Sequence, residues 1–218
     1  MNRWHCRFCN TPSGRPLPLD GDEPQRVAES VKEMNLKYVV LTSVDRDDLP
    51  DMGAEHWRQT VEAVRQLCPA KIEVLLPDFQ GRDDLMDIVL LSRPDVVAHN
   101  IETVRRLTPV VRSVATYEGS LHVLRHIHDQ GFVAKSGLML GLGETEAEVL
   151  QTLRDLRDSG VDRVTIGQYL QPTAHHLPVA AYIAPDKFRW YRDQALQMGF
   201  CSVVSGPLVR SSYKAGMD

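Results

Sequence analysis

Six short runs rich in β-branched residues recur along the chain, and a longer amphipathic segment separates each run from the next. Continuous apolar runs of this length are typical of strands buried on both faces of a parallel sheet. The predicted strands cover residues 37–42, 71–76, 95–98, 133–140, 163–167 and 201–204. The predicted helices cover residues 24–34, 54–67, 83–91, 119–129, 144–159 and 185–198. This alternation predicts βαβ crossovers and therefore an α/β fold.

Composition excludes several classes of protein. Apolar residues make up 43% and charged residues 25% of the 218 residues, which is ordinary for a globular chain. The net charge of −4 argues against a nucleic-acid binder held by bulk electrostatics. No apolar run approaches the ~18 residues of a spanning helix, and the first residues carry no signal peptide. We therefore expect a cytoplasmic protein without a membrane or nucleic-acid partner, and its four cysteines suit a reducing compartment.

Polar side chains follow every predicted strand. In α/β barrels and sheets, functional groups gather at the carboxyl ends of the strands. The polar stretches occupy residues 42–48, 77–79, 99–103, 141–144, 168–172, and 205–206 followed by 210–213. The general hydrophilicity of loops explains part of this pattern, but a site assembled from six successive strand ends is the more economical interpretation.

Cys6 and Cys9 form a CxxC motif near the start of the chain. A zinc site normally needs a second pair of ligands, whereas Cys68 and Cys201 are single and are predicted to be buried packing residues. A thioredoxin-like motif would follow a strand and open a helix, but loop residues follow Cys9. A disulfide remains open, and so does an iron–sulfur cluster, which uses thiolates at such short spacings.

The segment GLGE at residues 141–144 follows a predicted strand and opens a helix. Its backbone N–H groups could approach a ligand at the helix N-terminus. A tight turn between strand and helix is an equally good interpretation, and the pattern is not the GxGxxG of a dinucleotide site.

Two further loops carry potential metal ligands. Asp45, Asp47 and Asp48 could bind a divalent ion, or with Arg46 they could form a salt-bridged loop. The adjacent pair at residues 175–176 is two histidines, which could bind a metal, although loop histidines more often act singly in capping or substrate contact.

Long strings along the chain are similar to the lipoyl synthases, a family of radical S-adenosylmethionine enzymes. The strings are YVVLTSVDRDDL (38–49), IEVLLPDFQG (72–81), HNIETVRR (99–106), KSGLMLGLGE (135–144), VDRVTIGQYLQPT (161–173) and SGPLVRSSY (205–213). They run in this order over residues 6–215, which is nearly the whole chain, so the resemblance is specific.

The resemblance implies a partial (β/α)6 TIM-like barrel of the radical SAM type, as a single domain over residues 1–218. Residues 1–23 would form its cluster-binding loop region, and residues 200–218 its last strand and RSSY segment. It also implies a [4Fe-4S] cluster in a CxxxCxxC loop that binds S-adenosylmethionine. The radical formed there removes hydrogens at C6 and C8 of an octanoyl chain, and a second, auxiliary [4Fe-4S] cluster supplies two sulfur atoms. Partners would be an octanoylated lipoyl carrier protein and an electron donor such as a flavodoxin or ferredoxin, with the enzyme a monomer.

The resemblance also assigns site residues. Cys6 and Cys9 match the last two cysteines of the radical-cluster motif, and Ser211 matches the serine that binds the auxiliary cluster through oxygen. Position and chemistry place five further residues near S-adenosylmethionine, namely Thr42, Ser43, Asn100, Glu102 and Lys135.

The sequence departs from the family pattern at its start. Asn2 stands where the first cluster cysteine is expected, and His5 is a weak candidate for a replacement ligand. The auxiliary-cluster cysteines and the first barrel strand are also missing from this sequence. We therefore keep two hypotheses, an N-terminally truncated enzyme and a catalytically incomplete barrel that retains cofactor or carrier binding. A barrel stabilised by zinc at Cys6 and Cys9 is the weakest alternative.

Overall fold

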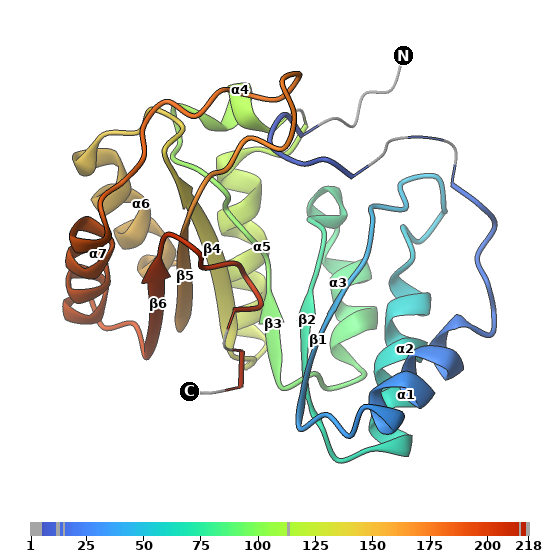
Figure 1. The fold of residues 1–218 in the computed structure, drawn as a ribbon. Helices are drawn as coiled ribbons and strands as arrows, with labels where there is room; N and C mark the ends of the chain where they lie inside the picture. The colour runs from blue at the N-terminus through green and yellow to red at the C-terminus, as the bar shows by residue number, and fades with distance from the viewer. Residues whose placement is uncertain (1–5, 12–13, 15, 113, 214, 217–218) are drawn as a thin grey trace. The chain divides into compact units, whose positions relative to one another are not determined.

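A computed structural model describes residues 6–11, 14, 16–112, 114–213 and 215–216 (Figure 1). The predicted site residues Asn2 and His5 lie outside the described residues. The chain divides into two compact units. Unit 1 comprises Met1–Gly14 and His99–Tyr213, and unit 2 comprises Arg15–Ala98 and Lys214–Asp218. The expectation of one domain over residues 1–218 stays a prediction.

Unit 2 contains three parallel strands and the helices that connect them. The strands are β1 (Tyr38–Thr42), β2 (Lys71–Leu75) and β3 (Val96–Ala98). The helices are α1 (Glu23–Glu33), α2 (Ala54–Leu67), the 3-10 turn η1 (Phe79–Gly81) and α3 (Asp83–Leu90). In register, Val40 of β1 lies beside Glu73 of β2, which lies beside Val96 of β3.

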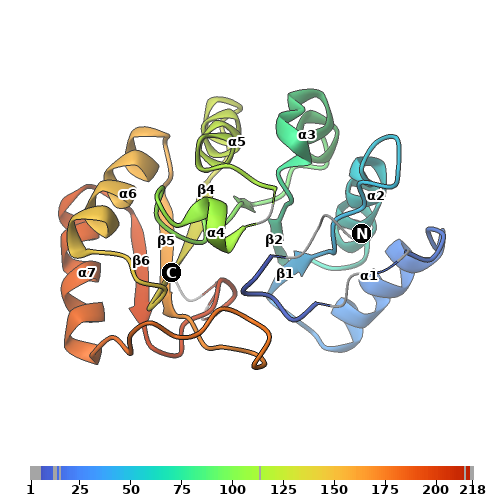
Figure 2. The same cartoon turned by 90° about the horizontal axis from the view of Figure 1, so that it is seen from above.

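Unit 1 repeats this plan. Its strands are β4 (Ala134–Leu140), β5 (Arg163–Gln168) and β6 (Ser202–Gly206), and all are parallel. Its helices are α4 (Thr108–Val111), α5 (Tyr117–Asp129), α6 (Glu146–Asp158) and α7 (Pro185–Gln197). α6 begins with a capping box, in which Thr145 and Glu148 satisfy each other's backbone N–H groups. Figure 2 shows α5, α6 and α7 lined up beside β4, β5 and β6.

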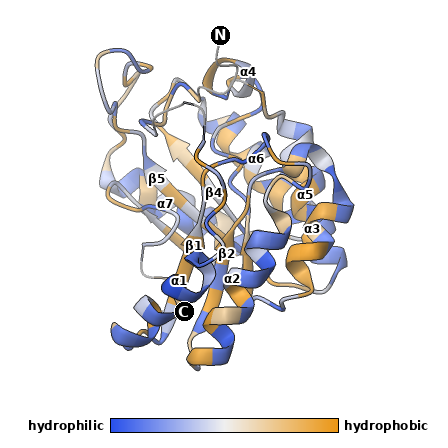
Figure 3. Ribbon diagram, turned by 90° about the vertical axis from the view of Figure 1, so that its right-hand side faces the viewer, coloured by the Kyte–Doolittle hydropathy of each residue, from blue (hydrophilic) through white to orange (hydrophobic). Residues whose placement is uncertain are grey.

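The core of unit 1 fills the space between these helices and strands. It combines strand residues such as Leu138 and Ile166 with helix residues such as Leu124, Leu153 and Phe188, all of them buried. Figure 3 shows apolar and polar residues alternating around the helices, so each helix buries one face and exposes the other.

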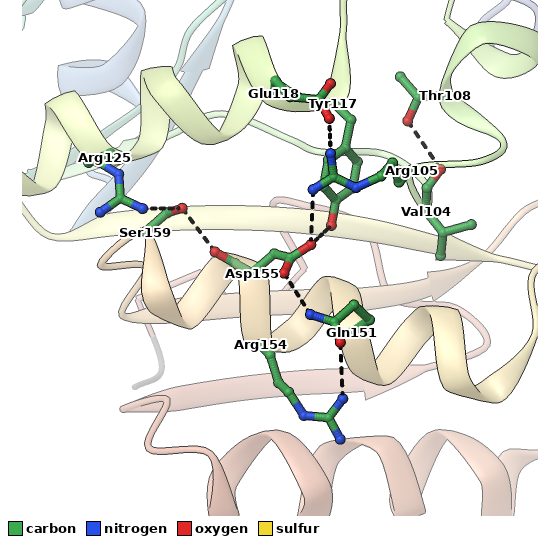
Figure 4. A network of polar contacts seen from close by, with 10 residues as sticks. All are labelled: Val104, Arg105, Thr108, Tyr117, Glu118, Arg125, Gln151, Arg154, Asp155 and Ser159. Carbon is green, nitrogen blue, oxygen red and sulfur yellow. Dashed lines mark hydrogen bonds and ion pairs between the residues drawn. The ribbon is translucent and has the colours of Figure 1, made fainter.

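A polar network ties α5 to α6 in unit 1 (Figure 4). Asp155 is its centre, because its carboxylate accepts the Tyr117 hydroxyl at 2.9 Å and the Gln151 amide at 2.8 Å. Arg105 stacks on the Tyr117 ring at 4.3 Å, pairs with Glu118 and reaches Asp155 at 3.4 Å. We call these five residues the outer network.

The structure confirms the predicted α/β alternation. All six predicted strands and all six predicted helices are present, with ends that shift by at most two residues. The sequence interpretation missed only η1 and α4, which are short. In the described part of the chain no strand precedes α1, as expected. Nor does any described helix have the length and apolar character needed to cross a bilayer.

Candidate functional site

A cavity of about 370 Å³ lies within unit 1 at the carboxyl ends of its strands. Three groups of residues line it: the CxxC loop, the segment that follows β3 together with β4 and β5, and the turn that follows β6. The first group is Phe8, Cys9 and Asn10, and the last is Val209, Arg210 and Ser211. The middle group includes Asn100, Glu102, Gly137, Thr165, Gly167 and Gln168. Carboxyl ends of parallel strands are where α/β folds bind their ligands.

Two glycines within the strands make room for this cavity. A Cβ atom on Gly137 would lie 2.6 Å from Asn100 Oδ1 and 3.1 Å from Thr165 Oγ1. A Cβ atom on Gly167 would lie 2.3 Å from the Val209 carbonyl oxygen. Glycine weakens a strand unless a close approach requires it. These two positions therefore hold the Asn100 side chain and the 209–211 segment against the strand ends.

Glu102 carries a strained backbone at the cavity wall. Its φ is 68°, which is the left-handed region that a glutamate rarely adopts. The conformation is held because the Glu102 N–H donates to the Gly137 carbonyl at 3.0 Å and its carbonyl accepts the Met139 N–H at 2.8 Å. Strain of this kind concentrates at functional sites.

Opposing interactions act on the pKa of the Glu102 carboxyl. Burial raises its pKa above the usual range, and the charge of Arg112 and a hydrogen bond with Asn100 oppose that rise. Arg112 is itself buried, and its Nη1 donates to Ser120 Oγ at 2.6 Å. The buried His99 places Nε2 3.0 Å from the same oxygen. Arg112 is thus fixed by contacts with Ser120, and its charge limits the rise that burial causes in the Glu102 pKa.

The two cysteines of the CxxC motif lie on a turn, because the Cys9 N–H donates to the Cys6 carbonyl at 3.2 Å. Both are half-buried, and Cys9 lines the cavity. The Cys9 sulfur accepts the Thr11 N–H at 3.4 Å. Among the described residues no group of three or more His, Cys, Asp or Glu side chains is placed to hold a metal ion. The structure thus describes two of the three positions at which the resemblance implies thiolates, Cys6 and Cys9, and Asn2, at the third position, is not described.

The other predicted cofactor residues fall into two sets. Lys135 is buried at the start of β4, on the same face as Gly137 because strand side chains alternate, but it is not part of the cavity lining. Thr42, the last residue of β1, and Ser43 are exposed in unit 2. Of the five, only Asn100 and Glu102 line the cavity.

Two open alternatives from the sequence can now be compared with geometry. The Glu144 carboxylate accepts the N–H groups of Gly141 at 2.6 Å and Leu142 at 2.9 Å, so this segment is a turn whose N–H groups are satisfied by its own side chain. Arg46 forms a two-pronged ion pair with Asp48, with both distances 2.9 Å, as the salt-bridged interpretation expected.

The prediction of two buried packing cysteines was wrong. Cys201 is exposed, because it stands one residue before β6 begins. Cys68 is half-buried at the end of α2, where its thiol donates to the Val64 carbonyl.

Sequence reasoning missed several residues of the cavity, chiefly Gly137, Thr165, Gly167 and Val209. The two glycines carried a usable signal, since each lies inside a predicted strand and such a glycine marks a close approach. Thr165 and Val209 carried none, because they resemble ordinary strand and turn residues.

Comparison with known proteins matches this geometry to a class. A family model for the radical SAM superfamily matches residues 3–156. Among solved structures, methylornithine synthase (PylB) superposes with a TM-score of 0.70 at 16% identity, over 99% of this chain and 73% of that one. The Streptococcus suis protein SuiB bound to S-adenosylmethionine gives 0.72 at 11% identity, over 97% of this chain and 49% of that one. The chain therefore belongs to the radical SAM superfamily and has its α/β barrel fold.

Curated relatives narrow the assignment. Lipoyl synthases from Parabacteroides distasonis and Bacteroides fragilis are each 56% identical over 211 residues, which is 96% of this chain and 75% and 73% of theirs. The lipoyl synthase of Treponema denticola is 54% identical, over 96% of this chain and 73% of its own. The chain belongs to the lipoyl synthase family.

Proposed function

We propose that the unit 1 cavity binds S-adenosylmethionine for the reaction of the lipoyl synthase family, which inserts sulfur at C6 and C8 of a protein-bound octanoyl chain. The observation that carries the proposal is the Glu102–Asn100 pair, which lies beside Gly137 in the middle of β4. SuiB, which has a similar fold, binds S-adenosylmethionine in its crystal structure.

The residues of the cavity suit the cofactor's polar groups. An ionised Glu102 accepts hydrogen bonds from ammonium or hydroxyl groups, and the Asn100 amide can both donate and accept. Arg210 lines the cavity on the other side, where its Nη1 donates to the Val209 carbonyl at 2.7 Å and leaves further N–H groups for a carboxylate. Bound S-adenosylmethionine would supply the radical that removes hydrogen from C–H bonds, because an acid or base cannot activate such bonds.

Iron–sulfur binding is a separate part of the proposal. Cys6 and Cys9 would supply thiolates to the radical cluster, and Ser211, half-buried at the cavity, would offer an oxygen to an auxiliary cluster. The described residues fit these clusters only in part, because two thiolates do not make a three-thiolate site. We therefore keep the expectation that the 218-residue chain alone holds fewer than two [4Fe-4S] clusters.

Several assignments extend beyond the cavity. We propose an octanoylated carrier protein or domain as substrate, a flavodoxin or ferredoxin as electron donor, a monomeric state and a cytoplasmic location. Thr42, Ser43 and Lys135 stay predicted cofactor contacts.

Calorimetric titration of the chain with S-adenosylmethionine tests the cavity. We expect Glu102→Gln to weaken binding at least tenfold, about 1.4 kcal/mol, because the amide keeps the shape but loses the charge. Glu33→Gln, an exposed change in α1, is the control and should bind as the parent chain does. Equal affinity for Glu102→Gln and the parent would overturn the proposal.

Anaerobic reconstitution with iron and sulfide separates the two hypotheses about the chain. S-adenosylmethionine binding with little iron would support the catalytically incomplete barrel. About eight irons per chain, together with sulfur insertion into an octanoyl carrier, would contradict the expectation of fewer than two clusters.

A further inference from the structure

The backbone of the CxxC loop is anchored on both sides at Arg7. The Arg7 N–H donates to the Val111 carbonyl at 3.0 Å, and the Arg7 carbonyl accepts the Leu177 N–H at 3.1 Å. In Figure 1 the blue loop lies beside the orange segment between β5 and α7, which carries Leu177. A loop with no regular secondary structure is thereby bound to two segments distant in sequence.

His176, next to Leu177, makes a third contact and makes it at a cysteine. Its Nε2 lies 2.9 Å from the Cys9 carbonyl oxygen. A carbonyl oxygen only accepts, so Nε2 carries the hydrogen. On the other side of the ring, Nδ1 lies 2.8 Å from Thr173 Oγ1, which in turn accepts the His175 N–H at 3.3 Å. The Thr173 hydroxyl and the Cys9 carbonyl therefore hold the two ring nitrogens from opposite sides.

The segment that carries His176 is itself held in place. The Gln171 amide donates to the His176 carbonyl at 3.0 Å, and the Tyr169 hydroxyl donates to the Leu177 carbonyl at 2.7 Å. Further along, the buried Gln168 side chain donates to the Ala181 carbonyl and accepts the Ile183 N–H at 2.9 Å. His176 therefore offers its hydrogen bond from a fixed position, which is what a positioning group requires.

We propose that His176 is a positioning residue for Cys9, and that its Nε2–H···O=C hydrogen bond sets where the Cys9 backbone, and with it the thiol, sits at the cavity. The hydrogen bond at the Cys9 carbonyl and the Thr11 N–H at the Cys9 sulfur fix the residue at two atoms. The proposal rests on the proposed function only for the role of Cys9 as a cluster ligand, since the contact exists in the chain without a cluster.

The neighbouring histidine supplies a matched control. His175 is exposed and the structure describes only its backbone N–H in a hydrogen bond, so truncating its side chain leaves the contact to Cys9 intact. Cys201 is exposed on another part of unit 1 and serves as an internal reference thiol.

The experiment compares His176→Ala, His176→Gln and His175→Ala in the cluster-free chain. Thiol alkylation followed by peptide mass spectrometry gives the rate at Cys9 relative to Cys201, and amide hydrogen exchange gives the opening of residues 6–11. We expect His176→Ala to raise both about fivefold to tenfold, the effect of losing one hydrogen bond on local opening. His176→Gln, which retains an N–H donor, should return to within about twofold, and His175→Ala should match the parent chain.

Three results would overturn the proposal: an unchanged Cys9 rate in His176→Ala, an equal change in His175→Ala, or no rescue by glutamine. A melting curve for each variant excludes general unfolding as the cause. Titration with S-adenosylmethionine runs in parallel, so a failed Cys9 test with normal loss of binding in Glu102→Gln would leave the proposed function standing.

Discussion

The cavity and the outer network are two polar clusters of unit 1. They come close in sequence, because Glu102 of the cavity and Arg105 of the outer network are three residues apart. In the outer network every principal group is satisfied within the chain, since the Asp155 carboxylate accepts Tyr117 and Gln151 and pairs with Arg105. At the cavity, Glu102 sits at a φ of 68° with a raised pKa. Polar groups whose hydrogen bonds and ion pairs are satisfied by one another stabilise the fold. A residue with a strained backbone and a shifted pKa indicates instead where a ligand is expected.

The largest effect is expected from Asp155→Ala. The change leaves the partly buried Tyr117 hydroxyl without its acceptor and removes one end of the Arg105 contact. Denaturant unfolding should show a loss of about 2–4 kcal/mol, the range for breaking a partly buried network. Affinity for S-adenosylmethionine should stay within about twofold of the parent, because the change does not alter the cavity lining. A large loss of affinity at unchanged stability would break the comparison.

Gly137→Ala should reduce binding of S-adenosylmethionine more than it reduces stability. Its Cβ would lie 2.6 Å from Asn100 Oδ1, so the amide must turn into the cavity. Overpacking of this kind costs about 1–3 kcal/mol, and here we expect it to appear in binding, as a tenfold to hundredfold loss of affinity by calorimetry. The melting temperature should change less than the affinity, since the nearest contact is the end of a side chain and not backbone. Gly131→Ala, at a glycine with open space around it but a φ of 82°, should affect stability rather than binding.

Arg112→Met tests the electrostatic half of the cavity. Burial raises the Glu102 pKa and Arg112 opposes this, so removing the charge raises that pKa further. Because Glu102 is proposed to bind as the carboxylate, affinity should fall more at acid pH than at alkaline pH. A rise of about one pKa unit corresponds to up to a tenfold loss below the new pKa. Titrations between pH 5.5 and 8.5, about the neutral range, measure the profile, and a pH-independent loss would assign Arg112 a packing role alone.

The smallest effect is expected at an exposed pair. Arg106 and the Thr145 backbone lower the pKa of Glu148 to about 2. A lowered carboxyl pKa contributes stability that is present above the unfolded value, 4.5, and is lost as pH falls toward 2. Glu148→Gln keeps the capping geometry but loses the ion pair, so we expect a loss of about 0.5–1 kcal/mol at pH 7. At acid pH the free energies of unfolding of the parent and of Glu148→Gln should converge. A difference that stays constant with pH would contradict the assignment.

The sequence predicted the fold well because its signals were local. The strands follow from β-branched runs and the helices from amphipathic segments, and each signal lies within the element it defines. α4 and η1 were missed because four-residue and three-residue elements carry no periodicity.

The site was only half predictable. Asn100 and Glu102 follow a strand directly, so their place at the cavity could be inferred from position. The contact of His176 with Cys9 joins residues 167 positions apart, and nothing local marks it. The positive φ of Glu102 was equally hidden, because it is imposed by hydrogen bonds to β4 rather than by its own neighbours.

The close packing at Gly167 also determines what a mutation at this codon would do. A Cβ there would come within 2.3 Å of the Val209 backbone, which has no flexible end to move aside. Every amino-acid exchange at Gly167 adds that atom, so each would push away the turn that bears Arg210 and Ser211. A mutation in the codon of Gly167, within β5, would therefore displace Arg210 and Ser211 from the cavity. The loss of function would look like a mutation of those two residues, although their own codons are unchanged.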